Sequence, residues 1–165
     1  MGERSIRVRL ERHIILRTSW IFGIWRDIFV KNILALAADQ RSLNIVSDQF
    51  AGSSSARSIA ELILKIIGLY EQNADLPWVT YHSSQTPYVT WHEFAKHVVK
   101  QGKAMRLIPE YVQVHPVSCK VLSLRAHRPP NSCLDTSLIQ KTFGLEVSRW
   151  TDEMGDFLIA TSTGV

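Results

Sequence analysis

The segment Arg17–Trp20, RTSW, carries an unusual concentration of side chains that could bind a polar ligand. It directly follows Ile14–Leu16, a short apolar run with β-branched residues that predicts a buried strand. Ligands of α/β proteins bind outside the carboxyl ends of the strands, where a guanidinium, two hydroxyls and an indole could hold a small molecule. Alternatively, Trp20 belongs to the core and Arg17 is a solvated strand end. The local pattern leaves both interpretations open.

Known catalytic spacings are absent from the sequence. The eight glycines form neither G-x-G-x-x-G nor a Walker motif, and there is no H-E-x-x-H, G-x-S-x-G or C-x-x-C. Cys119 and Cys133 are too far apart in sequence to make a metal site by themselves, and no metal ligand is predicted. His92 and His97 are expected on the polar side of a helix, as surface residues. The residues alone predict an α/β domain that binds an anionic small molecule.

Composition predicts a single unit over residues 1–165, with an ordinary globular core and no repeat or linker. The net charge of +4 and the pI of 9.3 favour anions such as a nucleotide or phosphate. The positive residues are scattered and match no nucleic-acid motif, so nucleic acid is not an expected partner. No apolar run approaches the roughly 20 residues of a membrane helix, and the arginine-rich start is not a signal peptide. A reduced cytoplasmic protein without a membrane partner is expected.

Apolar periodicity predicts a few strands and about five helices. The expected strands are Ile14–Leu16, Leu43–Val46 and Trp78–His82. The expected helices cover about 28–38, Ala56–Tyr70, 91–102, 136–143 and 150–158, and residues 1–12 are either the last turns of a helix or a frayed start. The second expected helix, Ala56–Tyr70, has one stripe formed by Ile59, Ile63, Ile66, Ile67 and Tyr70, and the last has Trp150, Met154, Phe157 and Leu158 inward.

Turn and cap residues predict where these elements begin and end. Thr90 and Glu93 form a capping box, and a serine of Ser53–Ser55 caps the helix that follows. Free amide groups at that serine-capped end can also hold an anion, although a plain cap is the favoured interpretation. The proline-containing segment Ile108–Val117 is expected to be irregular and extended.

Six motifs in order resemble the dTDP-4-dehydrorhamnose reductase family. They are Ile15–Gly23 (ILRTSWIFG), Phe29–Val30, Val46–Phe50 (VSDQF), Tyr81–His82, Thr90–Ala95 (TWHEFA) and Arg128–Asp135 (RPPNSCLD). These enzymes are extended short-chain dehydrogenases/reductases that use NADPH to reduce the 4-keto group of a thymidine-diphosphate sugar. The resemblance implies an α/β fold: the C-terminal part of a Rossmann-type enzyme, with residual Rossmann strands and a substrate-binding lobe.

The resemblance also implies that the N-terminal dinucleotide-binding half is missing from this sequence. The family's catalytic Tyr-x-x-x-Lys lies just upstream of a Gly-Glu pair, which Gly2 and Glu3 match. Because this tyrosine donates the proton, the 165-residue chain alone is expected to be inactive. No catalytic residue is therefore assigned within it.

The family pattern implies roles for seven residues. Arg17, Thr18 and Ser19 would face the nicotinamide of NADPH, while Trp20, Phe29, Gln49 and Arg128 would bind the substrate. Arg128 would lie near the diphosphate, since a guanidinium suits phosphate oxygens, or would bond to backbone carbonyls around the prolines. Asp48 and Gln49 either shape the pocket or form a turn. Magnesium is a possible further cofactor.

Two departures from the family pattern are expected to weaken substrate binding. Ile28 replaces an asparagine, and Ala51–Ser54 (AGSS) stands where the family has Gly-x-Pro-Thr, so the proline is lost while Ser54 retains the hydroxyl. The alternative function is a non-catalytic regulatory module, like the family relative that serves methionine adenosyltransferase. Exposed edges of a half-enzyme also predict a possible homodimer.

Overall fold

The structure is a computed structural model that describes residues 2–25, 29–72, 75–121 and 128–162. Ile28 lies outside these residues. The helices are α1 (Gly2–Arg9), α2 (Phe29–Asp39), α3 (Ala56–Gln72), α4 (Trp91–Ala104), α5 (Ser137–Phe143) and α6 (Trp150–Ser162). The strands are β1 (Ile15–Thr18), β2 (Ile21–Phe22), β3 (Ser42–Val46), β4 (Phe50–Gly52), β5 (Ser54–Ser55), β6 (Thr80–Ser83), β7 (Tyr88–Thr90) and β8 (Gln113–Val117). The fold is therefore α/β, as predicted, and within the described ranges no helix is long and apolar enough to span a membrane.

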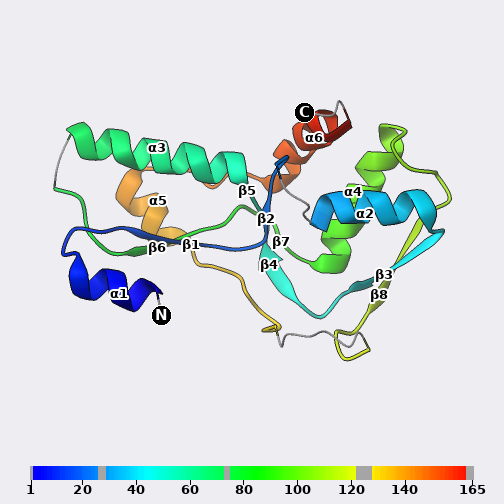
Figure 1. The fold of residues 1–165 in the computed structure, drawn as a ribbon, viewed down its shortest axis with the longest axis horizontal. Coiled ribbons are helices and arrows are strands. Elements are labelled where there is room, and N and C mark those ends of the chain that lie inside the picture. The colour runs from blue at the N-terminus through cyan, green and yellow to red at the C-terminus, as the bar shows by residue number, and fades with distance from the viewer. Residues whose placement is uncertain (1, 26–28, 73–74, 122–127, 163–165) are drawn as a thin grey trace.

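The strands form four pairs. β1 with β6, β2 with β5 and β3 with β8 are parallel, whereas β4 and β7 are antiparallel. Figure 1 shows the β1–β6 pair with α3, α5 and α1 on one side of the molecule, and the β3–β8 pair with α2 and α4 on the other. The short strands β2, β4, β5 and β7 lie between these two groups and connect them.

Two apolar clusters stabilise the two groups. The larger joins α2, α4, β3 and α6, and its most buried side chains include Val30, Ile33, Phe94, Val98 and Leu158. The smaller joins α3, α5 and the β1–β6 pair through Ile66, Tyr81, Ile139 and Phe143. The four residues predicted to face inward from the last helix are all buried, which confirms that prediction: Trp150, Met154, Phe157 and Leu158.

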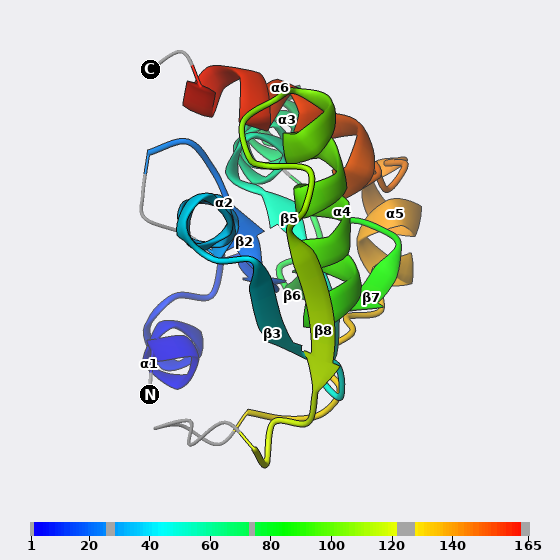
Figure 2. The ribbon, with the colours of Figure 1, turned by 90° about the vertical axis from the view of Figure 1, so that its right-hand side faces the viewer.

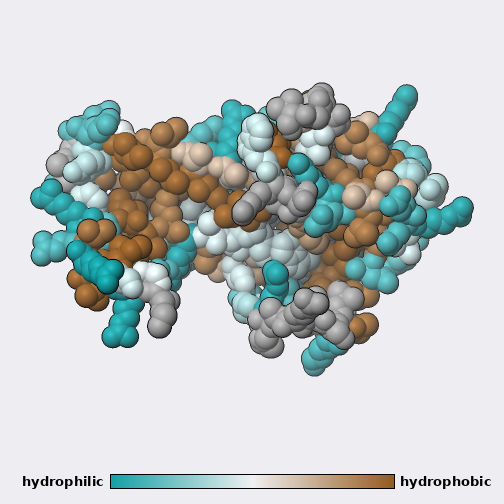
Figure 3. Space-filling model, viewed as in Figure 1, coloured by the Kyte–Doolittle hydropathy of each residue, from teal (hydrophilic) through white to brown (hydrophobic). Residues whose placement is uncertain are grey.

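The predicted apolar stripe of α3 is not buried as expected. Only Ile66 is buried, whereas Ile63, Ile67 and Tyr70 are 42%, 47% and 40% exposed. These three side chains instead line an open groove of about 600 Å³ beside Ile14. Figure 3 shows the apolar surface between α3 and α1. The helix period was predicted correctly, but in the described structure nothing covers most of this face.

The segment predicted to be irregular, Ile108–Val117, contains strand β8. Gln113 N donates to Arg41 O at 3.0 Å, and Ser47 N donates to Val117 O at 2.9 Å. Because alternate residues of β8 face β3, the backbone groups of Val114 and Pro116 point away from it. Pro116 is tolerated because it occupies such an outward position. Figure 2 shows β8 beside α4.

Helix α4 begins at the predicted capping box, in which Glu93 N donates to Thr90 Oγ1 at 3.1 Å and Thr90 N donates to Glu93 Oε2 at 2.8 Å. The helix continues past Gly102, because that glycine serves packing: a Cβ there would lie 3.1 Å from Leu34 and 3.3 Å from Ile108. The helix therefore ends two residues beyond the predicted range of 91–102.

The prediction that His97 is a surface residue holds only in part, because the residue is partly buried. Its ring packs edge-on against Trp150, 5.1 Å between centroids, and Nε2 is buried with no hydrogen-bond partner in the described structure. Burial, together with nearby Lys100, lowers the pKa of His97 below its ordinary value of 6.5.

Candidate functional site

Trp20 lies just beyond the end of β1, where the sequence predicted a ligand site. Its φ angle is +41°, a left-handed conformation that costs a non-glycine residue of order 1–3 kcal/mol. Two hydrogen bonds hold its carbonyl oxygen in place, from Ser54 N at 3.1 Å and from Ser53 Oγ at 3.0 Å. The proline that the resemblance implies at position 53 could not donate the second bond, so Ser53 gives Trp20 a contact that such a proline would lack.

The side chain of Trp20 belongs to an aromatic cluster of four rings, Trp20, Phe29, Trp91 and Phe94. Trp20 stacks on Trp91 with 3.6 Å between centroids and 17° between planes, and Phe29 contacts Trp91 at 4.3 Å. Phe94 lies edge-on to Trp20 at 6.5 Å. Phe94 is buried, while the other three are partly buried and pack against the larger core. The structure thus joins two of the predicted substrate residues, Trp20 and Phe29.

Gln49 and Arg128 are connected to this cluster through β4. Gln49 is buried and precedes Phe50, which pairs with Thr90, the neighbour of Trp91. On the other side, Phe50 N donates to Pro130 O and Ser132 N donates to Phe50 O, both at 2.8 Å, so the loop after Arg128 is bonded to β4. The Arg128 side chain is exposed and forms no hydrogen bond to any residue described. The predicted alternative bond to carbonyls around the prolines is not formed within the described residues.

Asp48 closes the end of the β3–β8 pair. Its carboxylate accepts hydrogen bonds from Ser118 Oγ at 2.6 Å and from Cys119 N at 3.0 Å. The Ser118 bond, followed by that of Cys119, lowers the pKa of Asp48 below its ordinary value. Of the two roles predicted for Asp48, shaping the pocket or forming a turn, this geometry fits the second.

The predicted cofactor residues differ in their surroundings. Arg17 donates two bonds to Glu3 of α1, at 2.8 and 2.7 Å, and the pair is exposed. The Arg17 hydrogen bond lowers the pKa of Glu3. Thr18 Oγ1 is buried without a hydrogen-bond partner in the described structure, and Ser19 is partly buried. Thr18 therefore keeps an unused hydroxyl, whereas the guanidinium of Arg17 is occupied.

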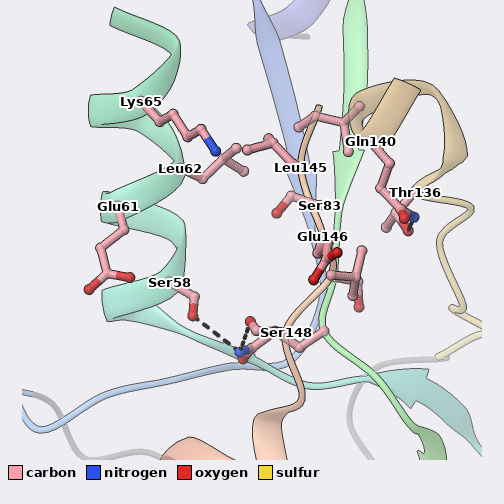
Figure 4. A pocket seen from close by; sticks show the side chains of 14 residues that line it. Ser58, Glu61, Leu62, Lys65, Ser83, Thr136, Gln140, Leu145, Glu146 and Ser148 are labelled. Atoms are coloured by element: carbon pink, nitrogen blue, oxygen red, sulfur yellow. Dashed lines mark hydrogen bonds between the residues drawn. The ribbon is translucent and has the colours of Figure 1, made fainter. Parts of the chain in front are cut away.

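A separate cavity of about 260 Å³ opens between α3, α5 and the segment before α6. Figure 4 shows Lys65 and Ser58 of α3 on one wall, with Thr136, Gln140, Leu145 and Glu146 opposite. None of the predicted site residues lines it. Buried Gln85, which no sequence motif indicated, also lines the cavity.

Gln85 belongs to a polar network centred on Glu153 of α6. The Glu153 carboxylate accepts hydrogen bonds from the hydroxyls of Ser55 and Ser58, and from Gln85 Nε2 at 2.5 Å. Ser55 Oγ also accepts from Ser58 N at 2.9 Å, which confirms the predicted serine cap of α3. The run of serines in the sequence indicated a helix cap in this region. Nothing in the sequence indicated Glu153 as its partner, because Glu153 lies about a hundred residues further along the chain.

Metal chemistry has no visible site in the described part of the chain. No group of three or more His, Cys, Asp or Glu side chains there is close enough to hold an ion. Cys119 and Cys133 are both free thiols.

Comparison with known proteins gives this geometry a family. The RmlD substrate binding domain model matches residues 1–162. The chain belongs to this family. Among curated relatives, the dTDP-4-dehydrorhamnose reductase of Aggregatibacter actinomycetemcomitans is 33% identical over 149 residues, covering 90% of this chain and 51% of that protein.

Solved structures of RmlD-type proteins show the same fold. The dTDP-4-dehydrorhamnose reductase of Bacillus anthracis, solved in complex with NADP, superposes with a TM-score of 0.81 at 26% identity, over 96% of this chain and 52% of that one. A dTDP-4-dehydrorhamnose reductase from Clostridium acetobutylicum gives a TM-score of 0.85 at 22% identity, over 98% and 53%. The chain thus spans about half the length of the relatives it matches, and the predicted resemblance is confirmed.

Proposed function

We propose that this RmlD domain is the substrate-binding part of a dTDP-4-dehydrorhamnose reductase-like protein. The intact enzyme would reduce dTDP-4-dehydro-L-rhamnose to dTDP-L-rhamnose with NADPH. The observation that carries this is the exposed guanidinium of Arg128 on a loop whose Pro130 and Ser132 hydrogen-bond to Phe50 of β4. β4 follows buried Gln49 and pairs with β7, which leads into Trp91 of the aromatic cluster. A cation suits a diphosphate, and partly buried aromatic rings suit the apolar faces of a sugar or base.

The cofactor residues of the proposal are Thr18 and Ser19, with Arg17 beside them. The buried hydroxyl of Thr18 has no partner in the described structure, which fits a group that completes its hydrogen bonding to a bound cofactor. NADPH would supply the hydride in the intact enzyme. Arg17 would contribute only after leaving Glu3.

Titration of the chain with thymidine diphosphate in a calorimeter tests substrate binding. We expect saturable binding that Arg128→Ala weakens about tenfold or more, because the charged hydrogen bonds to phosphate oxygens are lost. Arg106→Ala, which removes an exposed arginine of the turn after α4, is the matched control and should leave the affinity unchanged.

A second measurement addresses catalysis. The purified chain mixed with NADPH and the keto-sugar should not oxidise NADPH, because the sequence holds neither the family's Tyr-x-x-x-Lys nor its glycine-rich loop. Turnover would contradict this part of the proposal. Absence of any thymidine nucleotide binding, together with a stable protein partner isolated from cells, would instead favour the regulatory alternative.

A further inference from the structure

We infer that Gln85 is a positioning residue for Trp20, acting through Ser53–Ser55, which we call the serine segment. The inference rests on the proposed function for the role of Trp20 in substrate binding, but its geometric part stands without it. Among the described residues, Gln85 has no hydrogen bond to Trp20 or to the other predicted substrate residues Phe29, Gln49 and Arg128. It determines where the backbone next to Trp20 lies.

The serine segment is what holds Trp20 in its left-handed conformation. Ser53 and Ser54 supply both hydrogen bonds to the Trp20 carbonyl, and all three serines of the segment are at most 5% exposed. β5 also pairs with β2, in the register Ile21 with Ser54. Any shift of this segment therefore changes the direction in which the Trp20 ring leaves the backbone.

Gln85 binds the serine segment at both of its ends. Its backbone N donates to Ser53 O at 3.2 Å, and its side-chain Oε1 accepts from Ser55 N at 2.7 Å. The amide side chain is itself fixed, because Nε2 lies 2.5 Å from Glu153 Oε1 and 2.7 Å from Ser148 Oγ. Nε2 also donates to Ser58 Oγ at 3.1 Å. The dashed lines at Ser58 and Ser148 in Figure 4 mark these two hydrogen bonds.

Chemical type matters at this position as much as shape. Glu153 can only accept hydrogen bonds, so the group that faces it must donate while its other end accepts from Ser55 N. A glutamine amide meets both demands. A carboxylate in its place would face the Glu153 carboxylate directly, and the repulsion would displace the side chain from the serine segment.

This donor–acceptor arrangement gives a matched rescue. In Gln85→Glu the two carboxylates oppose each other, whereas the double variant Gln85→Glu/Glu153→Gln restores one donor and one acceptor across the same contact. We expect the Trp20–Trp91 stack to be lost in the single variant and recovered in the double variant. The signal of the stack is the difference between the near-ultraviolet circular dichroism spectra of wild type and of Trp91→Phe, which lacks the stack.

The expected result is loss of most of this signal in Gln85→Glu, with unchanged far-ultraviolet dichroism and a cooperative melt, and recovery of at least half in the double variant. Lys65→Ala, on the wall of the same cavity but outside the network, should keep the full signal. If Gln85→Glu does not fold, Gln85→Asn, which keeps the amide but shortens its reach, decides by the same signal. A folded single variant with the wild-type signal would overturn the inference.

Thymidine diphosphate affinity separates the inference from the proposed function. If both hold, Gln85→Glu weakens binding about tenfold or more and the double variant recovers it, because a small misplacement of a binding group is costly. If no variant binds the nucleotide but the stack follows the pattern above, the positioning role stands and the proposed function fails. If wild type and Gln85→Glu bind equally and share the stacking signal, the positioning role fails.

Discussion

The carboxylate of Glu3 accepts two hydrogen bonds from the Arg17 guanidinium, one from Nε at 2.8 Å and one from Nη2 at 2.7 Å. α1 has no buried residue, and its polar contacts to the rest of the chain include this pair and a 2.8 Å bond from Arg7 Nη2 to Thr80 Oγ1. Exposed ion pairs are screened by salt and contribute little to global stability. The pair therefore tethers one helix and does not stabilise the whole fold.

Glu3→Gln should release α1 without unfolding the rest of the chain. We expect faster tryptic cleavage at the arginines of α1, and the same effect from high salt on wild type, with an unchanged melting temperature. Glu61→Gln breaks a comparable exposed pair with Arg57 inside α3 and is the control. Equal cleavage of wild type and Glu3→Gln would show that other contacts hold α1.

Protonation of His97 should destabilise the fold in mild acid. Because burial lowers its folded-state pKa, the unfolded chain binds the proton first as the pH falls below about 6.5. The contribution of neutral His97 to the free energy of unfolding is therefore fully present above that pH. It decreases as the pH falls from there towards the lowered pKa of the folded state. Urea titrations between pH 5 and pH 8 should show a shallower decline in His97→Leu, while His115→Gln, at an exposed histidine, keeps the wild-type slope.

Gly52→Ala should destabilise the chain by about 1–3 kcal/mol or more, because overpacking forces the surroundings to move. A Cβ at this position would lie 2.2 Å from Ser84 Oγ and 2.5 Å from the carbonyl oxygen of Gln85. Gly68→Ala is the matched control: nothing lies within 4 Å of a Cβ there, and alanine favours a helix interior by about 0.5–1 kcal/mol. Opposite shifts of the urea midpoint are expected, and a neutral Gly52→Ala would contradict the close approach.

The apolar groove beside α3 should drive reversible self-association, which would account for the predicted homodimer. Ile63, Ile67 and Tyr70 are exposed on one helix face and line the groove. Sedimentation over a range of protein concentrations should show a rising average mass that Ile67→Lys abolishes. Val121→Lys, at an apolar residue that is 73% exposed away from the groove, should leave it unchanged. A concentration-independent monomer would contradict the prediction.

Local patterns predicted the elements whose determinants are local. The capping box of Thr90 and Glu93 spans three residues, and the inward face of α6 follows its own period, so both could be read directly. β4, β5 and β7 have only two or three residues each, and such short strands exist because of partners distant in the chain. β8 was missed because Pro116 usually excludes a strand, and only pairing with β3 makes its position acceptable.

The site was predicted only in part for the same reason. The resemblance named Trp20, Phe29, Gln49 and Arg128, and the structure connects these residues through the aromatic cluster and β4. The resemblance gave no indication that Glu3 is the partner of Arg17, because that pairing depends on how α1 packs. Gln85 and Glu153 are 68 residues apart and match no motif, so only the folded chain reveals that they meet.

The outward side of β8 has a consequence for how the protein behaves when concentrated. Pro116 has no amide hydrogen to offer a neighbouring strand, and the outward carbonyl of Val114 lies 3.3 Å from His92 Nε2. A strand that lacks one donor and has one acceptor already engaged is a poor template for fibril growth. Replacing Pro116 would restore the donor, and with it the capacity of this edge to recruit another chain into an amyloid-like ladder.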